Sequence, residues 1–170
     1  ELTLKTLPQP RVAATLAIAE LDDAAALKAM ASAMGSPIEI AAAAHRPADV
    51  GDGRALTAFR IQGFGPSVAA RAAMLVDRLA PFGRVEPLDR AQADDFWDGL
   101  RTLAPLPAAP PLWRINVAPR AGLAVVDALR PLGAYWLLDW AGGLIWLACE
   151  DGAAVRAAAA SAGGHATLVR

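Results

Sequence analysis

The stretch Ala134–Cys149, AYWLLDWAGGLIWLAC, decides the fold of the second half of this sequence. Two apolar runs, 134–141 and 144–149, flank Gly142-Gly143, and adjacent glycines favour a two-residue hairpin turn because both turn positions tolerate positive φ. Counting outward from this turn predicts the following core-face pairs: Trp140 with Ile145, Leu138 with Leu147, and Trp136 with Cys149. The opposite face of this antiparallel pair is mixed, since it places Asp139 beside Trp146.

The same order of elements is predicted in both halves of the chain. In the first half we predict strand 11–21, helix 22–35, strand 38–44, strand 56–62, helix 65–79 and strand 84–88. In the second half we predict strand 112–117, helix 121–129, strands 134–141 and 144–149, helix 153–162 and strand 165–170. Asp22 and Asp151 stand where helix N-caps are expected. Each half therefore has the order βαββαβ, which is typical of a ferredoxin-like unit.

The fold class that follows is α+β. We predict two tandem ferredoxin-like βαββαβ units with an antiparallel sheet and helices packed mainly on one face. The first unit is assigned to residues 11–90 and the second to residues 112–170. A helix and a proline-rich crossing segment connect them over residues 91–111. Residues 1–10 alternate like a strand and then meet two prolines, so we interpret them as the remnant strand and linker of an upstream domain.

Composition excludes several classes of function. The 170 residues include 16 basic and 17 acidic side chains, for a net charge of -1, with no block of like charge. Neither nucleic acid nor membrane insertion is therefore expected. Cys149 is the single cysteine; it fits a reducing, cytoplasmic compartment, and its place on the core face predicts a buried small hydrophobe. With two histidines and this one cysteine, no metal site made by this chain alone is expected.

Two further motifs are interpreted as structural. Gly63-Phe64-Gly65 precedes a predicted helix and starts like a dinucleotide-binding fingerprint, but Val68 stands where the third glycine would fall. A tight strand-to-helix turn is therefore the preferred interpretation. His45 precedes a loop rich in proline, aspartate and glycine, and we predict that it is solvated.

The candidate site is the sheet face that the two helices of each unit leave uncovered. Polar and aromatic side chains are predicted there: Thr15, Glu39, Arg60, Gln62, Arg114, Asn116, Tyr135, Asp139, Trp146, His165 and Thr167. From this set we select the candidates that face a substrate, a flavin or a partner subunit, namely Arg114, Asn116, His165, Trp146 and Arg60. Arg114 is either a solvated cation or a clamp for a carboxylate, and His165 is either a terminal histidine or a polar group directed at a substrate. An exposed Trp146 suggests an interface. No catalytic residue is assigned.

Four segments carry a family resemblance: ELTLKTLP at 1–8, PPLWRINV at 110–117, WLLDWAGGLIWL at 136–147 and AGGHATLVR at 162–170. They resemble the FAD-binding subunits of glycolate oxidase, which are FAD-linked oxidases of the vanillyl-alcohol-oxidase type. The likeness extends over essentially the whole chain and is strongest after Leu112. Ile145 stands where arginine is common in that family, which weakens any expectation of a basic group there.

The resemblance implies the carboxyl-terminal substrate or cap domain, residues 11–170, of an FAD-dependent 2-hydroxy-acid dehydrogenase that oxidises glycolate to glyoxylate. It implies FAD in the full-length protein, bound mainly by an upstream domain, no cofactor in this fragment, and no activity of the fragment alone. The implied partners are the upstream FAD-binding domain of the same chain, a second flavin subunit and an iron–sulfur subunit. The implied location is cytoplasmic, with membrane association through partner subunits left open.

Two other interpretations remain open at this stage. One is a structural assembly domain whose open sheet face docks a sister subunit. The other is a ferredoxin-like ligand sensor, which draws only on the fold, and this fold supports many functions.

Overall fold

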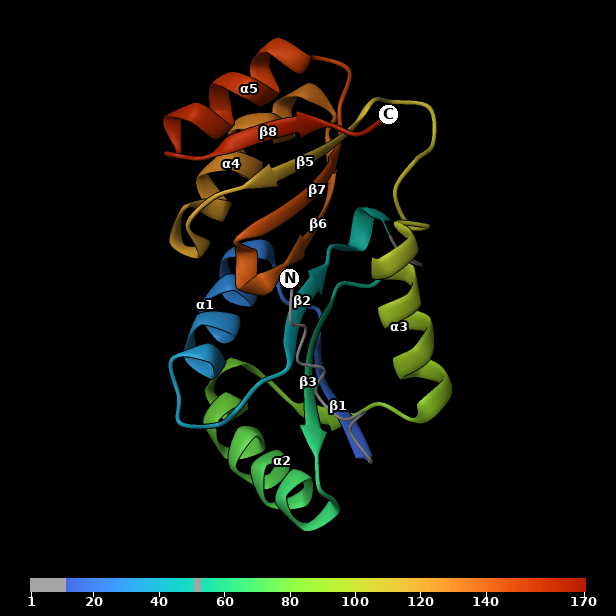
Figure 1. The fold of residues 1–170 in the computed structure, drawn as a ribbon, viewed down its shortest axis with the longest axis vertical. Coiled ribbons are helices and arrows are strands. Elements are labelled where there is room, and N and C mark those ends of the chain that lie inside the picture. The colour runs from blue at the N-terminus through green and yellow to red at the C-terminus, as the bar shows by residue number, and fades with distance from the viewer. Residues whose placement is uncertain (1–11, 51–52) are drawn as a thin grey trace, which may run out of the picture.

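Residues 12–50 and 53–170 are described by the structure, a computed structural model; the expectations for residues 1–10 lie outside the described residues. Eight strands form one antiparallel sheet in the order β4-β1-β3-β2-β6-β7-β5-β8, and five α-helices pack on it (Figure 1). The α+β prediction is confirmed.

The elements keep the predicted order, with small shifts at their ends. The first half contains β1 Val12–Ala19, α1 Asp23–Met34, β2 Ala42–Arg46, β3 Leu56–Gly63, α2 Gly65–Leu79 and β4 Val85–Pro87. The helix α3 Arg90–Thr102 follows. The second half contains β5 Leu112–Asn116, α4 Gly122–Leu129, β6 Tyr135–Asp139, β7 Leu144–Ala148, α5 Gly152–Ser161 and β8 His165–Leu168. Short 3₁₀ turns include η1 Ala48–Val50 after β2, η3 Pro119–Ala121 before α4, η4 Arg130–Leu132 after α4 and η5 Trp140–Gly142 between β6 and β7.

Each half of the sheet has the ferredoxin-like strand order. The first half reads β4-β1-β3-β2, and the second, read from the opposite edge, is β8-β5-β7-β6. The halves join through β2 and β6, the second strand of each, where His45 is paired with Leu138. This junction turns two four-stranded sheets into one continuous sheet.

Aspartates set the starts of three helices. Asp22 accepts a hydrogen bond from the Ala25 amide at 2.7 Å at the start of α1, and Asp151 accepts from the first amides of α5. Asp89 and Gln92 form a capping box at the start of α3. Each carboxylate satisfies amides that the helix itself leaves free, which stabilises a helix by about 1 kcal/mol. The caps predicted at Asp22 and Asp151 are confirmed.

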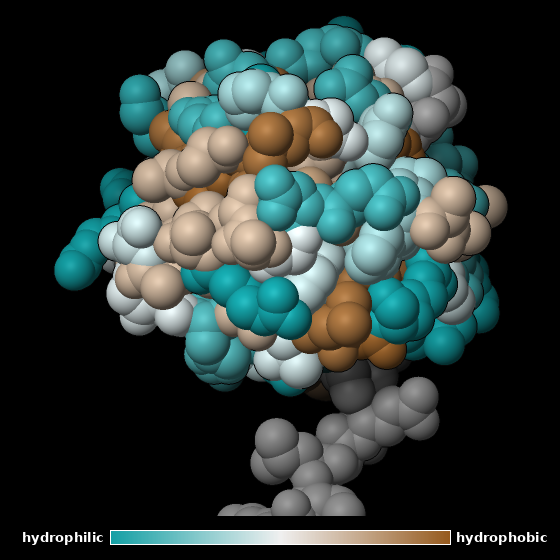
Figure 2. All heavy atoms as spheres, turned by 90° about the horizontal axis from the view of Figure 1, so that it is seen from above, coloured by the Kyte–Doolittle hydropathy of each residue, from teal (hydrophilic) through white to brown (hydrophobic). Residues whose placement is uncertain are grey.

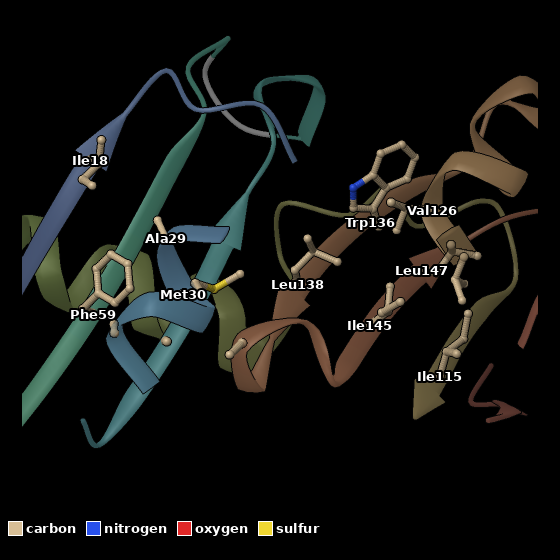
Figure 3. Packing of buried hydrophobic residues seen from close by; sticks show 14 of the residues in the cluster. Ile18, Ala29, Met30, Phe59, Ile115, Val126, Trp136, Leu138, Ile145 and Leu147 are labelled. Carbon is tan, nitrogen blue, oxygen red and sulfur yellow. The ribbon is translucent and has the colours of Figure 1, made fainter. Parts of the chain in front are cut away.

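One hydrophobic core runs through both halves (Figure 3). Fully buried side chains of the first half, such as Met30 and Phe59, continue into Leu138, Ile145 and Leu147 of the second. They lie between the sheet and the helices α1, α2, α4 and α5. Burial of each such side chain contributes about 1.5–3 kcal/mol, so the seam between β2 and β6 is held by packing as well as by strand pairing.

The helices do not all lie on one face, because α3 crosses the opposite face of the first half (Figure 1). Phe96 and Trp97 of α3 pack on alanines of β1, β2 and β3, whose small side chains allow close approach. Trp97 Nε1 donates to the hydroxyl of Thr15 at 3.0 Å. Thr15, which was predicted on the open face, is therefore buried. The open face is restricted to the second half and to the gap beside α3.

The predicted hairpin register is wrong by two residues. Leu138 is paired with Ile145 and Trp136 with Leu147, because Trp140–Gly143 forms a four-residue connection in place of the two-residue turn. A shift of two preserves the face of every side chain, since strand side chains alternate with period two. It nevertheless removes Trp140 from the core, and this side chain is 60% exposed.

Close packing of glycines explains the longer connection. Gly142 has φ +93° and lies against Leu27 of α1, where a Cβ atom would collide with the leucine side chain. A Cβ atom on Gly122, at the start of α4, would likewise collide with the Gly142 carbonyl oxygen. The connection is thus fitted between α1 and α4, and a tight turn at Gly142-Gly143 would lose this contact.

The end of the molecule at α5 mixes hydrophilic and weakly hydrophobic residues, with strongly hydrophobic ones in small groups (Figure 2). Ala153 and Ala157 are exposed residues of α5. Over the described part of the chain, the helices are too short or too polar to cross a bilayer.

Candidate functional site

The candidate site is a groove of about 680 Å³ on the sheet face that α1, α2, α4 and α5 leave free. Strands of both halves form its floor, α3 forms one wall and the β6–β7 connection forms the other. The side chains that give it chemical character are Arg60, Trp97, Arg114, Asp139, Trp140 and Trp146. The groove exists because β2 and β6 join the two halves edge to edge.

Two arginines on the floor lie beside tryptophans. The Arg60 guanidinium lies 5.2 Å from the Trp97 ring centre, and the Arg114 guanidinium lies 6.0 Å from that of Trp146. Such contacts orient a guanidinium without neutralising its charge. Among the described residues, no carboxylate forms an ion pair with either arginine, and the Nε atom of Arg60 is buried without a hydrogen-bond partner. Both cations are therefore available to an anionic ligand.

Asp139 ends β6 at the edge of the same groove. Burial raises the pKa of this carboxyl above its ordinary value, while a hydrogen bond from the Trp140 amide, 2.7 Å long, opposes the rise. Desolvation disfavours the charged form, so the protonated form is relatively stabilised. The groove thus combines two permanent cations with one acid whose ionisation is disfavoured.

Other charges at the rim are paired along α3. Arg101 contacts Asp98 at 3.2 Å, and Arg90 contacts Asp94 at 3.5 Å. These exposed pairs contribute little to stability, but they balance the acidic side chains of the wall locally. The positive character of the floor is consequently not cancelled by α3.

The structure brings together three of the five candidates selected from the sequence. Arg60, Arg114 and Trp146 line the groove, although Trp146 is only half-exposed because it also packs on a small apolar cluster. Asn116 and His165 lie outside the groove, where they are paired with each other between β5 and β8. His165 is exposed near the outer edge of the sheet, so neither residue contacts the groove floor.

Of the six side chains that give the groove its chemical character, three were not selected from the sequence: Trp97, Trp140 and Asp139. Trp97 falls in the helix predicted between the two units, but the sequence did not indicate that this helix lies beside Arg60. Trp140 was predicted to lie in the core, because a two-residue turn at Gly142-Gly143 would pair it with Ile145. Asp139 was placed on the open face, and only its burial beside the connection distinguishes it from the other polar residues there.

His45 is a correction to the sequence-based prediction, because it is 1% exposed and not solvated. Its Nδ1 atom lies 2.9 Å from the hydroxyl of Thr57, and its Nε2 atom lies 3.3 Å from Asp23 Oδ1. The cause is the β2–β6 junction, which covers a strand end that would otherwise be an exposed edge. His45 therefore has a buried role at the seam of the sheet.

Asp23 connects this cluster to the second half of the chain. Its carboxylate accepts hydrogen bonds from Arg130 at 2.7 Å and from Trp136 Nε1 at 3.2 Å. Burial alone would raise the pKa of Asp23, but the hydrogen bonds from His45, Arg130 and Trp136 hold it below its ordinary value. Arg130 also lies 4.7 Å above the Trp136 ring. The cluster acts as a polar cross-link between the two units.

Two structural interpretations, of Cys149 as a buried residue and of Gly63 as part of a turn, are confirmed. Cys149 is buried and free, and its carbonyl accepts a hydrogen bond from Trp113 Nε1 at 3.2 Å. Gly63 has φ +145° and ends β3 directly before α2, as expected for a tight turn. Within the described residues, no group of three or more His, Cys, Asp or Glu side chains is arranged to hold a metal ion.

Fold and groove together define a class: a tandem ferredoxin-like domain with one shared sheet and an arginine–tryptophan groove on its helix-poor face. No family model matches the chain, and no curated protein matches it. Among solved structures, alkyldihydroxyacetonephosphate synthase has a similar fold, with a TM-score of 0.55 at 12% sequence identity. The match covers 94% of this chain and 40% of that protein. The chain thus spans less than half the length of this neighbour, and the likeness shows a shared fold.

Proposed function

We propose that this chain is the carboxyl-terminal substrate or cap domain of an FAD-dependent 2-hydroxy-acid oxidase, with glycolate as the substrate that the sequence resemblance implies. Two independent lines support this. The PLWR and GGHATLVR segments resemble that family, and the fold neighbour alkyldihydroxyacetonephosphate synthase, whose match covers 94% of the chain, is a member of the FAD-linked oxidase family.

The observation that carries the proposal is a pair of arginines that lie beside tryptophans and have no carboxylate partner among the described residues. A guanidinium binds a carboxylate through two parallel hydrogen bonds, so Arg114 or Arg60 is suited to hold the acid group of a substrate. Trp97 and Trp146 shield the guanidinium groups from water on one side, which strengthens such an interaction. The chain's own contribution would be to bind and orient the acid; when bound, the flavin would supply the oxidant.

The groove fits part of FAD better than the whole of it. Indole rings suit the flat face of a flavin ring, whereas a diphosphate is commonly held at a glycine-rich turn before a helix. The turn before α2 is filled, because Arg71 Nη2 donates to the Gln62 carbonyl at 2.6 Å there and crowds Gly63. In the proposal, the rest of FAD is held by an upstream domain of the same chain.

The proposed assembly follows the family resemblance. It includes a second flavin subunit and an iron–sulfur subunit, and it acts in the cytoplasm. Electrons would leave the flavin through these partners, while this chain supplies the substrate side of the site.

A second candidate function is a structural assembly domain that docks a sister subunit. Trp140 and Tyr135 favour it, because both are large apolar side chains exposed on the groove side of the sheet. Exposed aromatic residues of this kind often anchor protein interfaces.

The deciding experiment replaces Arg60 and Arg114 by glutamine, singly and together, in the full-length complex. Arg84→Gln serves as the control, because its side chain is 88% exposed and the residue directly precedes β4, outside the groove. If the groove holds the substrate, the groove variants raise KM for the acid and leave subunit assembly unchanged. If the groove is only a docking surface, assembly weakens and KM does not change. Unchanged activity together with unchanged assembly would exclude both functions.

A further inference from the structure

The size of the groove sets the first constraint on its ligand. Its volume of about 680 Å³ lies in the range of sites that enclose drug-sized ligands. A two-carbon acid such as glycolate carries a carboxylate for an arginine but almost no apolar surface. It would leave most of the groove filled with water, and its few atoms limit the affinity that it can reach.

Aromatic side chains surround the two arginines from three separate elements. Trp97 comes from α3, Trp146 from β7 and Trp140 from the connection between β6 and β7. Trp97 is largely buried, but the exposed indole of Trp140 and the partly exposed indole of Trp146 offer contact area to a ring or a long apolar group. The sheet floor between them consists mainly of small and apolar residues, among them Ala42 and Leu144.

The position of Trp140 is imposed by the backbone. Trp140 and Ala141 have φ +49° and +55°, a conformation that non-glycine residues adopt at a cost of about 1–3 kcal/mol each. The packing of Gly142 against Leu27 and Gly122 holds the connection in this form. Strain at such a position is typical of functional sites, and here it keeps a large indole exposed at the mouth of the groove.

Charge complementarity defines the other part of the ligand. Arg60 and Arg114 have no carboxylate partner among the described residues, whereas Asp98 is neutralised by Arg101. The raised pKa of Asp139 lessens its repulsion of an incoming anion. An acid group is therefore favoured at the floor, with apolar bulk directed toward the indoles.

We infer that the groove binds 2-hydroxy acids that carry a large aromatic or apolar group on carbon 2, and that it binds these acids more tightly than glycolate, the small member of the class that the sequence resemblance implies. The hydroxy-acid part rests on the proposed function. The recognition of a carboxylate joined to an aromatic group rests on the groove alone.

The test measures binding to the 170-residue chain by tryptophan fluorescence and calorimetry, with mandelate, glycolate and neutral mandelamide as probes. Mandelate is expected to bind at least about tenfold more tightly than glycolate, because only its ring contacts the indoles. Mandelamide is expected to bind about tenfold more weakly than mandelate, because it lacks the charge that an arginine recognises.

Two variants test which side chain binds the carboxylate of the ligand and which binds its ring. Arg114→Gln is expected to weaken mandelate binding about tenfold, and Trp140→Ala to reduce the preference for mandelate over glycolate. Arg84→Gln, outside the groove, should change neither. Both groove side chains are exposed, and circular dichroism verifies that each variant is folded.

Three results would overturn the inference: glycolate binding equal to or tighter than mandelate, no saturable binding of either acid by the folded chain, or binding unaffected by both groove variants. Flavin reduction in the full-length protein separates this inference from the proposed function. Mandelate binding without flavin reduction supports the inferred ligand preference of the groove and contradicts the oxidase proposal. Faster flavin reduction by glycolate than by mandelate contradicts the inference and supports the oxidase proposal.

Discussion

Trp136 and Asp23 come from opposite halves of the chain, and the indole Nε1 of Trp136 donates a hydrogen bond to the Asp23 carboxylate at 3.2 Å in the buried seam of the sheet. Asp23 is 7% exposed and Trp136 is 3% exposed. Arg130 and His45 complete the shell around the carboxylate. Because α1 supplies the acid and the second unit supplies two of its partners, the cluster links the folding of the two units.

We predict that the stability of the chain falls in acid through Asp23. Its folded-state pKa is below the ordinary value of 3.8, so its contribution is present above that pH and is lost as the pH falls through the folded-state pKa. Urea unfolding between pH 6 and about pH 2.5 measures this. Asp23→Asn should lower the free energy of unfolding by about 2 kcal/mol at pH 7 and should flatten the acid part of the profile. If the free energy of unfolding of Asp23→Asn fell as steeply with acid as that of the unchanged chain, the role assigned to Asp23 would be contradicted.

Removal of the His45 imidazole is expected to be strongly destabilising. His45→Ala leaves a cavity and deprives Asp23 and Thr57 of a buried partner, so the free energy of unfolding should fall by about 2–4 kcal/mol. The measurement is the urea midpoint at pH 7. Arg84→Ala, at an exposed site, is the control and should change stability by less than about 0.5 kcal/mol. A similarly small effect for His45→Ala would favour the solvated histidine predicted from the sequence.

The Trp97–Thr15 hydrogen bond is expected to attach α3 to the sheet. Thr15→Val preserves the shape of the side chain but leaves the buried Trp97 Nε1 without its partner, at a cost of about 1–3 kcal/mol. Trp97→Phe removes the donor as well, so in this background Thr15→Val should cost clearly less. A double-mutant cycle measures the difference. Strict additivity would show that the hydrogen bond contributes nothing to the attachment.

The β6–β7 connection is expected to reject a side chain at Gly142. Gly142→Ala combines φ +93° with a Cβ atom that meets Leu27 and lies 3.3 Å from the Pro119 carbonyl oxygen, so we expect a loss of more than about 2 kcal/mol. Gly133→Ala is the matched control: φ is +69° and nothing lies within 4 Å, so only the backbone penalty of about 1 kcal/mol applies. Thermal unfolding compares the two. Equal losses would mean that the contact with Leu27 relaxes freely.

Local patterns in the sequence determined the order of elements and the face on which most side chains lie. Asp22 and Asp151 predicted helix starts because a carboxylate satisfies amides one turn ahead of it, a relation that is local by nature. Alternation assigned Ile145 and Leu147 to the core correctly even though the register was wrong by two, because a shift of two residues leaves strand faces unchanged. Arg60, Arg114 and Trp146 were selected for the same reason.

Contacts between distant segments decided the rest. His45 is buried because β2 meets β6, Thr15 is buried because α3 crosses the sheet, and Trp140 is exposed because Gly142 packs on α1. None of these relations has a periodic signature in the sequence, since each depends on how whole elements pack. The sequence by itself thus determined two βαββαβ units and a polar sheet face. Only the tertiary structure decided that the units fuse at their second strands and thereby place Arg60 and Arg114 in one groove.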